Sequence, residues 1–129
     1  MSNPAGKILI QPNVDVWPHE LRTARALANA GYSVTFLKRR EGKYERTADI
    51  VIGDIIWEMK SPKSEKLKRV ERTLRDGIHQ SPYLIFDSQR IRYLNDSQIH
   101  KELEKWAKEL RALRGLMFVT KKRDVIAIK

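Results

Sequence analysis

Residues 49–60 have the sequence DIVIGDIIWEMK, and this stretch decides the fold. Two apolar, largely β-branched runs flank Gly53 and Asp54. Glycine at the first position of a two-residue loop favours a type II′ turn, a connection that suits a β-hairpin. We therefore expect a hairpin with strands over 49–52 and 55–60.

The hairpin register distributes the side chains between two faces. Ile52 pairs with Ile55 across the turn, so Asp49 is expected opposite Glu58. Side chains alternate along a strand, which puts Lys60 on the same face as Glu58. We expect an apolar face against a helix and a second face that carries charges, with Ile50, Ile52, Ile55, Trp57 and Met59 on the first and Asp49, Val51, Ile56, Glu58 and Lys60 on the second.

Asp49 and Glu58 are candidate metal ligands. Opposed strand residues have Cβ atoms about 5 Å apart, and like charges there cost up to ~1 kcal/mol unless a cation lies between them. Oxygen ligands suit Mg²⁺, Mn²⁺ or Ca²⁺, and a metal held by two carboxylates beside a lysine can attack a phosphodiester. Lys60 would position the water or neutralise charge on the phosphorane. The alternative is a solvated polar face, although the apolar Val51 and Ile56 favour a covered one.

Hydrophobic periodicity and turn residues predict the elements around the hairpin. We expect helices over about 17–30, from a cap at Ser64 to about residue 78 and from near Ser97 to Gly115, and further strands over 32–37, 82–87, 116–120 and 124–128. The second helix should bury Leu67, Val70, Leu74 and Ile78, and the third Ile99, Leu103, Trp106, Leu110 and Leu113. This order predicts an α/β fold, a mixed β-sheet flanked by helices. Residues 1–14 form a lead segment, 17–87 an αβββαβ core, and 88–129 an extension with a helix and a hairpin.

Composition narrows the class of protein. The 129 residues suffice for one domain, and a hydrophobic fraction of 41% with 33% charged residues is typical of a globular chain. The absence of cysteine excludes disulfides, thiolate zinc sites and a cysteine nucleophile. No apolar run reaches the ~18 residues of a membrane helix, and the start lacks a signal peptide, so we expect no membrane partner. The net charge of +10 indicates a polyanionic partner, most often nucleic acid.

Glu20 is the unusual residue of the first predicted helix. At 100° per residue it falls on the same stripe as Ala24 and Leu27, which should be buried. A buried carboxylate needs a partner. Glu20 therefore either stays at the rim as an acid favoured by the helix dipole, or reaches the proposed metal.

Basic residues gather in two places. The loop that enters the hairpin carries Lys38, Arg39, Arg40, Lys43 and Arg46, and its closeness to the proposed metal favours phosphate contacts. A second group over 60–75, which includes Lys63, lies largely on the polar side of the second helix, where a solvated helix face would look similar. We rank the loop above the helix as the nucleic-acid contact.

The three histidines suggest a rival mechanism. His19, His79 and His100 fall in different elements. Two of them acting as general acid and base could cleave RNA without a metal through the 2′-OH. Scattered histidines of this kind are more often surface or hydrogen-bonded residues.

Several motifs together resemble a known nuclease superfamily. They are Trp17-Pro18-His19-Glu20, Ala28-Asn29-Ala30-Gly31-Tyr32-Ser33-Val34, Ala48-Asp49-Ile50, Trp57-Glu58-Met59-Lys60-Ser61-Pro62 and Gln80-Ser81. In this order they resemble the PD-(D/E)XK superfamily and, more narrowly, the C-terminal tRNase domains of bacterial contact-dependent growth inhibition (CdiA-type) toxins. The resemblance covers about residues 17–87 and implies a restriction-endonuclease-like core. Ala48 stands where many members have proline, which affects the turn and not the chemistry.

The resemblance also implies roles for individual residues. Glu20, Asp49 and Glu58 would hold Mg²⁺ or Mn²⁺, Lys60 would be the catalytic lysine, and Gln80 would position the substrate. The implied activity is that of a metal-dependent nuclease, most often an RNase acting on tRNA, that reaches the bacterial cytoplasm as part of a secreted toxin. An acidic immunity protein is an implied partner. Two alternatives stay open, a DNA endonuclease of the same superfamily and a non-catalytic basic module that binds RNA or DNA.

Overall fold

The computed structural model describes residues 5–38 and 49–129, without the side chain of Asp49. It confirms the predicted α/β class. In chain order the elements are β1 (Ile8–Ile10), α1 (Pro18–Asn29), β2 (Val34–Leu37), β3 (Asp49–Ile52), β4 (Ile55–Lys60), α2 (Lys68–Ile78), β5 (Tyr83–Asp87), α3 (Asp96–Glu109), β6 (Gly115–Val119) and β7 (Val125–Ala127). The chain divides within β4 into two compact units, an N-terminal unit that ends at Trp57 and a C-terminal unit that begins at Glu58. No helix in the described part of the chain has the length and apolar character needed to cross a membrane.

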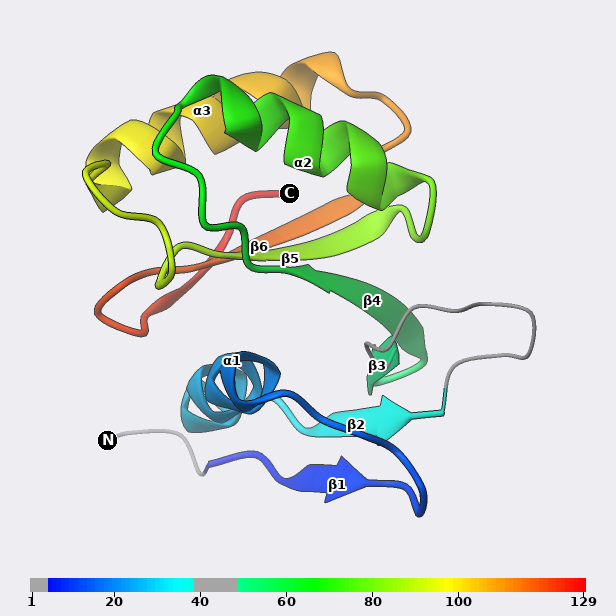
Figure 1. Ribbon diagram of the computed structural model, residues 1–129. Helices are drawn as coiled ribbons and strands as arrows, with labels where there is room; N and C mark the ends of the chain where they lie inside the picture. The colour runs from blue at the N-terminus through cyan, green and yellow to red at the C-terminus, as the bar shows by residue number, and fades with distance from the viewer. Residues whose placement is uncertain (1–4, 39–48) are drawn as a thin grey trace. The chain divides into compact units, whose positions relative to one another are not determined.

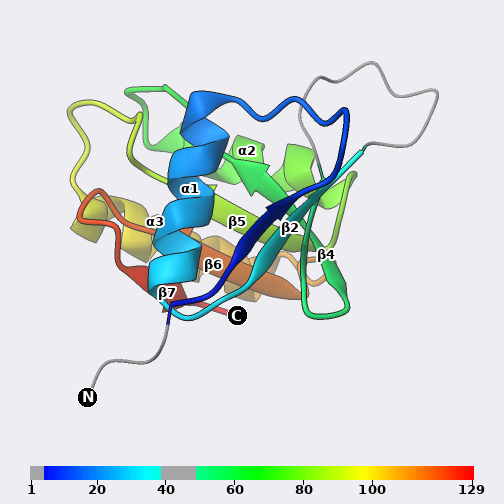
Figure 2. The same cartoon turned by 90° about the horizontal axis from the view of Figure 1, so that it is seen from below.

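The N-terminal unit contains the predicted hairpin. Strand β1 pairs in parallel with β2, β2 pairs antiparallel with β3, and β3 pairs antiparallel with the first half of β4. The predicted register is confirmed, because Ile52 pairs with Ile55 and Ile50 with Trp57. The pairing of Asp49 with Glu58 stays a prediction. Helix α1 lies against β1 and β2 (Figure 2).

The core of the N-terminal unit lies between α1 and one face of its strands. Leu27 of α1, Phe36 of β2 and Ile50 of β3 are all completely buried. The apolar face of the hairpin is thus confirmed at Ile50. The prediction of a buried apolar face is wrong near the turn, where Ile55 is 37% exposed. Ile55 belongs to the last strand pair before the turn, so no further strand residues cover it on that side.

The opposite face of the hairpin also departs from the prediction. We expected Val51 and Ile56 to be covered, but Ile56 is 47% exposed and Val51 only half-buried. On the apolar face Trp57, too, is only half-buried. Two adjacent β-branched residues, Ile55 and Ile56, point to opposite faces of the strand, so apolar composition alone does not say which face is covered.

Strand β1 was not predicted, because residues 1–14 were expected to form a lead segment to which no helix or strand was assigned. Its three residues are too few for a clear alternation, and its partner β2 lies far along the chain. The N–H of Gly6 donates to the carbonyl oxygen of Ala28 at 2.7 Å, which ties the entrance of β1 to α1. A Cβ at Gly6 would lie 1.9 Å from the Tyr32 oxygen, so only glycine allows this approach.

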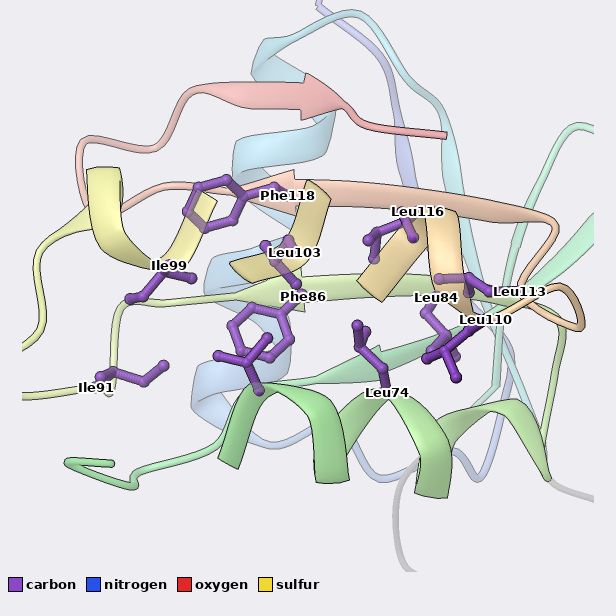
Figure 3. Packing of buried hydrophobic residues seen from close by; sticks show 12 residues of the cluster. Leu74, Leu84, Phe86, Ile91, Ile99, Leu103, Leu110, Leu113, Leu116 and Phe118 are labelled. Atoms are coloured by element: carbon purple, nitrogen blue, oxygen red, sulfur yellow. The ribbon is translucent and has the colours of Figure 1, made fainter. Parts of the chain in front are cut away.

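The C-terminal unit is built on a parallel sheet. Strand β5 pairs in parallel with the second half of β4 and with β6. Strand β7, at the edge of the sheet, pairs antiparallel with β6. Helices α2 and α3 lie side by side over one face of β5 and β6 (Figure 1). Figure 3 shows the core between these layers, where Phe86 and Phe118 from the strands meet Leu74 and Leu103 from the helices.

Helix α2 has the predicted apolar stripe but begins later than predicted. Val70 and Leu74 are buried, and Leu67 and Ile78 are partly buried against the same core. The predicted cap at Ser64 is wrong, because its hydroxyl accepts the Lys66 N–H at 3.1 Å and so closes a short turn ahead of the helix. The helix itself begins at Lys68.

Helix α3 begins as predicted and ends early. The Asn95 side chain accepts the Gln98 N–H at 2.8 Å, and the Gln98 side chain accepts the Asn95 N–H at 3.1 Å, which is a capping box. The helix ends at Glu109, whereas Gly115 opens β6. The Lys129 ammonium donates to the carbonyl oxygens of Ala107 and Leu110 at 2.7 and 3.2 Å, a distant contact that satisfies the helix end.

The remaining boundaries fall within one or two residues of the prediction. Leu110 and Leu113 still belong to the core although they follow α3 rather than form part of it. The burial pattern was therefore a better guide to the core than to the helix end.

Candidate functional site

Strand β4 carries the two candidate residues of the C-terminal unit. Glu58 and Lys60 are two positions apart, so both side chains leave the strand on one face. Glu58 pairs with Leu84 of β5, and Leu84 packs in the core under α2 and α3. Glu58 is only 4% exposed, whereas Lys60 is half-buried. The strand thus places a buried carboxylate next to an ammonium group that reaches solvent.

The structure brings Gln80 to Lys60. The Lys60 Nζ donates to the Gln80 Oε1 at 3.2 Å, from the end of β4 to the turn that follows α2. Gly77 of α2 lies beside this contact. A Cβ at Gly77 would lie 2.9 Å from both methyl carbons of Leu84, and 3.4 Å, an ordinary contact distance, from the Lys60 Cε. The absence of a side chain at Gly77 therefore lets α2 pack closely on Leu84, next to the lysine.

An open pocket surrounds the lysine. We call it the Lys60 pocket; its volume is about 260 Å³, and its lining consists of Lys60, Ser61, Pro62, Arg69, Thr73 and Asp76. Arg69, Thr73 and Asp76 follow a spacing of four and three residues, so they share one side of α2. Sequence reasoning missed Asp76 and Arg69 as neighbours of Lys60. The helical spacing was a usable signal, but the face that α2 turns toward β4 was not known.

Glu20 lies in the N-terminal unit and is 3% exposed, so its predicted burial is confirmed. Its Oε1 accepts the backbone N–H of Trp17 at 2.8 Å. This bond satisfies an amide just ahead of α1, and it places a negative charge in the first turn. Glu20 is therefore a buried capping acid, not an acid at the rim, and its role at a metal stays a prediction.

Asp49 opens β3 and pairs with Leu37 of β2. Its side chain lies outside the described residues, so its position relative to a metal is not defined. Among the side chains that are described, no three His, Cys, Asp or Glu residues form a group that could hold a metal ion. The donors proposed for the metal are all carboxylate oxygens, the chemistry that Mg²⁺ and Mn²⁺ prefer. The donor set fits a hard divalent cation.

The predicted basic loop is described only at its first residue. Lys38 is exposed, and its backbone N–H donates to the Gln11 Oε1 at 3.2 Å. The loop residues Arg39, Arg40, Lys43 and Arg46 lie outside the described residues. Lys63 is exposed in the segment between β4 and α2. Its nucleic-acid contact, like that of the loop, stays a prediction.

The three histidines have different surroundings, and the ring centroid of His19 in α1 lies 6.3 Å from that of Trp17. His79 is exposed just after α2. His100 of α3 lies 3.9 Å from the Glu104 carboxylate, and its ring centroid lies 5.7 Å from that of Phe118. These contacts are typical of a partly buried structural histidine.

Sequence reasoning also missed a buried ion pair. Asp87, the last residue of β5, is 2% exposed and accepts two hydrogen bonds from the Arg123 guanidinium, at 2.9 and 2.7 Å. Arg123 adopts a positive φ of 71° in the loop between β6 and β7, and it also donates to the Thr120 carbonyl oxygen. The two residues are 36 positions apart, so no local pattern connects them.

Comparison with known proteins gives one family and one similar structure. A family model described as the contact-dependent growth inhibition CdiA C-terminal domain matches residues 46–125. The chain is similar to the structure of a CdiA-CT/CdiI toxin and immunity complex from Burkholderia pseudomallei, with a TM-score of 0.72, 15% sequence identity and coverage of 96% of this chain and 99% of that one. At this identity the likeness concerns the fold. No curated protein matches the chain.

Proposed function

The chain belongs to the family of contact-dependent growth inhibition CdiA C-terminal domains, and from this premise we propose that it is a metal-dependent nuclease toxin that cleaves RNA, with tRNA as the expected substrate. The observation that carries the proposal is the Lys60 ammonium, which lines an open pocket on the same strand face as the buried Glu58 carboxylate. A carboxylate and a lysine at this spacing are suited to phosphodiester hydrolysis.

The proposed metal ligands are Glu58, Asp49 and Glu20, which offer only carboxylate oxygens. A bound Mg²⁺ or Mn²⁺ supplies charge neutralisation at the phosphate and activation of water. Glu58 is 4% exposed, and a charge in such surroundings attracts a bound cation more strongly than a charge in water does.

Lys60 acts on the phosphate and Gln80 positions Lys60. The amide oxygen of Gln80 holds the ammonium at 3.2 Å without neutralising it. The full positive charge of Lys60 therefore stays in the pocket, where it stabilises charge that develops on the phosphorane oxygens. A carboxylate in place of Gln80 would cancel much of this charge.

The proposed partner besides the substrate is an acidic immunity protein. The similar structure contains a toxin with its immunity protein, which supports a partner of this kind. The net charge of +10 favours an acidic surface on it. We further propose that the domain is delivered as part of a secreted toxin and acts in the bacterial cytoplasm.

The substrate is tested by incubating the full chain with total RNA and with supercoiled plasmid, in Mg²⁺, in Mn²⁺ and in chelator. We expect discrete RNA fragments with either metal and none in chelator. Cleavage of plasmid alone would assign the protein to the DNA-cutting alternative. Cleavage that survives chelation and is lost in His79→Ala or His100→Ala would favour the histidine mechanism and contradict the proposal.

The site is tested with Glu58→Gln, which keeps the shape of the side chain and removes its charge. We expect RNA cleavage to fall about 100-fold or more, because a neutral amide holds a hard cation poorly. Glu109→Gln, the same change at an exposed end of α3, is the matched control and should leave cleavage unchanged. Equal cleavage by the two variants would remove Glu58 from the site.

A further inference from the structure

A second pocket adjoins the Lys60 pocket along α2. It has a volume of about 630 Å³, and we call it the α2 groove. Its lining includes five basic side chains, Lys66, Lys68, Arg69, Arg72 and Arg75. Arg69 and Asp76 line both pockets, so the α2 groove and the Lys60 pocket share a wall. A ligand chain that fills one can continue into the other.

The basic side chains of the α2 groove differ in their partners. Arg75 is neutralised, because its Nε lies 2.7 Å from the Glu71 carboxylate and its guanidinium stacks 5.7 Å from the centre of the Trp106 ring. For Lys66, Lys68, Arg69 and Arg72 no carboxylate lies within ion-pair distance in the described parts of the chain. The groove therefore keeps four cations that no carboxylate of the described residues neutralises, beside two acids, Asp76 and the Glu71 that pairs with Arg75.

The chemistry of the groove favours a phosphate chain over a protein surface. Its lining contains no apolar or aromatic side chain. The centre of a protein interface is depleted in charged residues and enriched in aromatic ones, so a hollow lined by charged side chains and one serine is a poor protein-binding core. Guanidinium groups such as those of Arg69 and Arg72 match phosphate oxygens in two-pronged contacts.

We infer that the α2 groove binds the phosphates of a nucleic-acid strand that continues into the Lys60 pocket. The inference rests on the proposed function and extends it, since it assigns the strand path to α2 rather than to the basic loop ranked first from the sequence. Binding energy from nucleotides in the groove would help to hold the cleaved bond at Lys60. A long strand is thus a better substrate than a dinucleotide, which cannot reach the groove.

The test uses a double variant, Lys68→Gln with Arg72→Gln, in the full chain. Its matched control is Lys101→Gln with Lys122→Gln, two exposed lysines outside both pockets. Binding of a labelled single-stranded RNA of about 12 nucleotides, within the usual site sizes, is measured in chelator across a salt series. Cleavage of the same RNA and of a dinucleotide is measured with metal.

We expect the double variant to bind the RNA about tenfold more weakly. The slope of log affinity against log salt should fall by about 1.4, since each lost phosphate contact on a single strand removes about 0.7. Cleavage of the long RNA should fall, and cleavage of the dinucleotide should stay at the wild-type rate. The control pair should retain both the slope and the cleavage rates.

The outcomes separate the inference from the proposed function. An unchanged salt slope in a double variant that still cleaves RNA would overturn the inference and leave the nuclease intact. Absence of cleavage in the wild type, with a reduced slope in the double variant, would overturn the nuclease and retain the binding surface. Binding of polyglutamate as tightly as RNA, with equal loss in the double variant, would reassign the groove to an acidic protein and overturn the inference.

Discussion

Lys60 and Arg123 are two cations of the C-terminal unit that meet opposite kinds of partner. The Arg123 guanidinium forms two hydrogen bonds to Asp87, which is 2% exposed at the end of β5. The Lys60 ammonium, at the end of the neighbouring parallel strand β4, meets the neutral amide of Gln80 in an open pocket. The first cation is neutralised by a buried carboxylate, whereas the second keeps its charge toward solvent.

The partner of each cation distinguishes a charge that stabilises the fold from a charge that can act on a ligand. A buried, bidentate pair is complete, so it gives the fold a contact and leaves no charge for a ligand. A lysine held in place by an uncharged acceptor is oriented without being neutralised. The comparison predicts that changes at Asp87 affect stability and changes around Lys60 affect cleavage.

The largest effect is expected for Asp87→Ala. It leaves the partly exposed Arg123 guanidinium without its two hydrogen bonds to a buried carboxylate, which should cost about 2–3 kcal/mol of unfolding free energy. Urea denaturation monitored by tryptophan fluorescence measures it. Asp124→Ala, an exposed acid of the same loop, is the control and should change stability by at most about 0.5 kcal/mol. A loss below about 1 kcal/mol for Asp87→Ala would show that the ion pair between Asp87 and Arg123 contributes little to the stability of the fold.

The next effect concerns Glu20→Gln. Glutamine can still accept the Trp17 N–H, so the helix should persist with a loss of about 0.3–1 kcal/mol from the missing dipole interaction. We expect metal-dependent cleavage to fall at least about tenfold, because the amide offers no charge to the cation. A metal titration of cleavage, paired with a thermal melt, separates the two effects. Wild-type metal dependence would leave Glu20 as a capping acid alone.

Gln80→Leu should have a smaller effect on cleavage. The substitution removes the acceptor that orients Lys60, and we expect a loss of about fivefold, about 1 kcal/mol of hydrogen-bond energy. Gln80→Glu should also lower cleavage, because it neutralises the ammonium, and its rate relative to wild type at the same pH should rise as the pH falls and the new carboxylate is protonated. Pre-steady-state cleavage at several pH values measures both. Full activity in both variants would separate Gln80 from catalysis.

The smallest effect is expected for Gly77→Ala. Alanine favours a helix by about 1 kcal/mol over glycine, but its Cβ would lie 2.9 Å from the buried methyl groups of Leu84. Overpacking of this kind costs about 1–3 kcal/mol, so we expect a net loss of about 1 kcal/mol. Asp76→Ala, the preceding position, provides the comparison for helix propensity. A more stable Gly77→Ala would show that α2 or the Leu84 side chain can shift to make room for the added methyl group.

The sequence predicted those parts of the fold that depend on local pattern. The hairpin register followed from Gly53-Asp54 and the strand alternation, and the buried stripe of α2 followed from its 3.6-residue period. The parts it missed depend on distant contacts. The end of α3 is satisfied by Lys129, and β1 forms because Gly6 and the strand itself meet residues far along the chain.

The residues of the candidate site likewise fall into those that the sequence predicted and those that depend on distant contacts. The spacing of Glu58 and Lys60 put both on one strand face from sequence alone, and the resemblance to a nuclease family pointed to Gln80. Asp76 and Arg69 could not be assigned to the pocket, because the sequence does not show which side of α2 faces β4. Asp87 carried no signal at all, since its partner Arg123 lies 36 residues away.

We expect the charge of Lys60 to serve cleavage and not the fold. The most direct measurement compares RNA cleavage and unfolding free energy in Lys60→Met, which keeps the length of the side chain and removes the ammonium, with Lys122→Met as the exposed control. We predict a loss of cleavage of about 100-fold or more with stability within about 0.5 kcal/mol of wild type. Wild-type cleavage by a folded Lys60→Met protein would contradict the account.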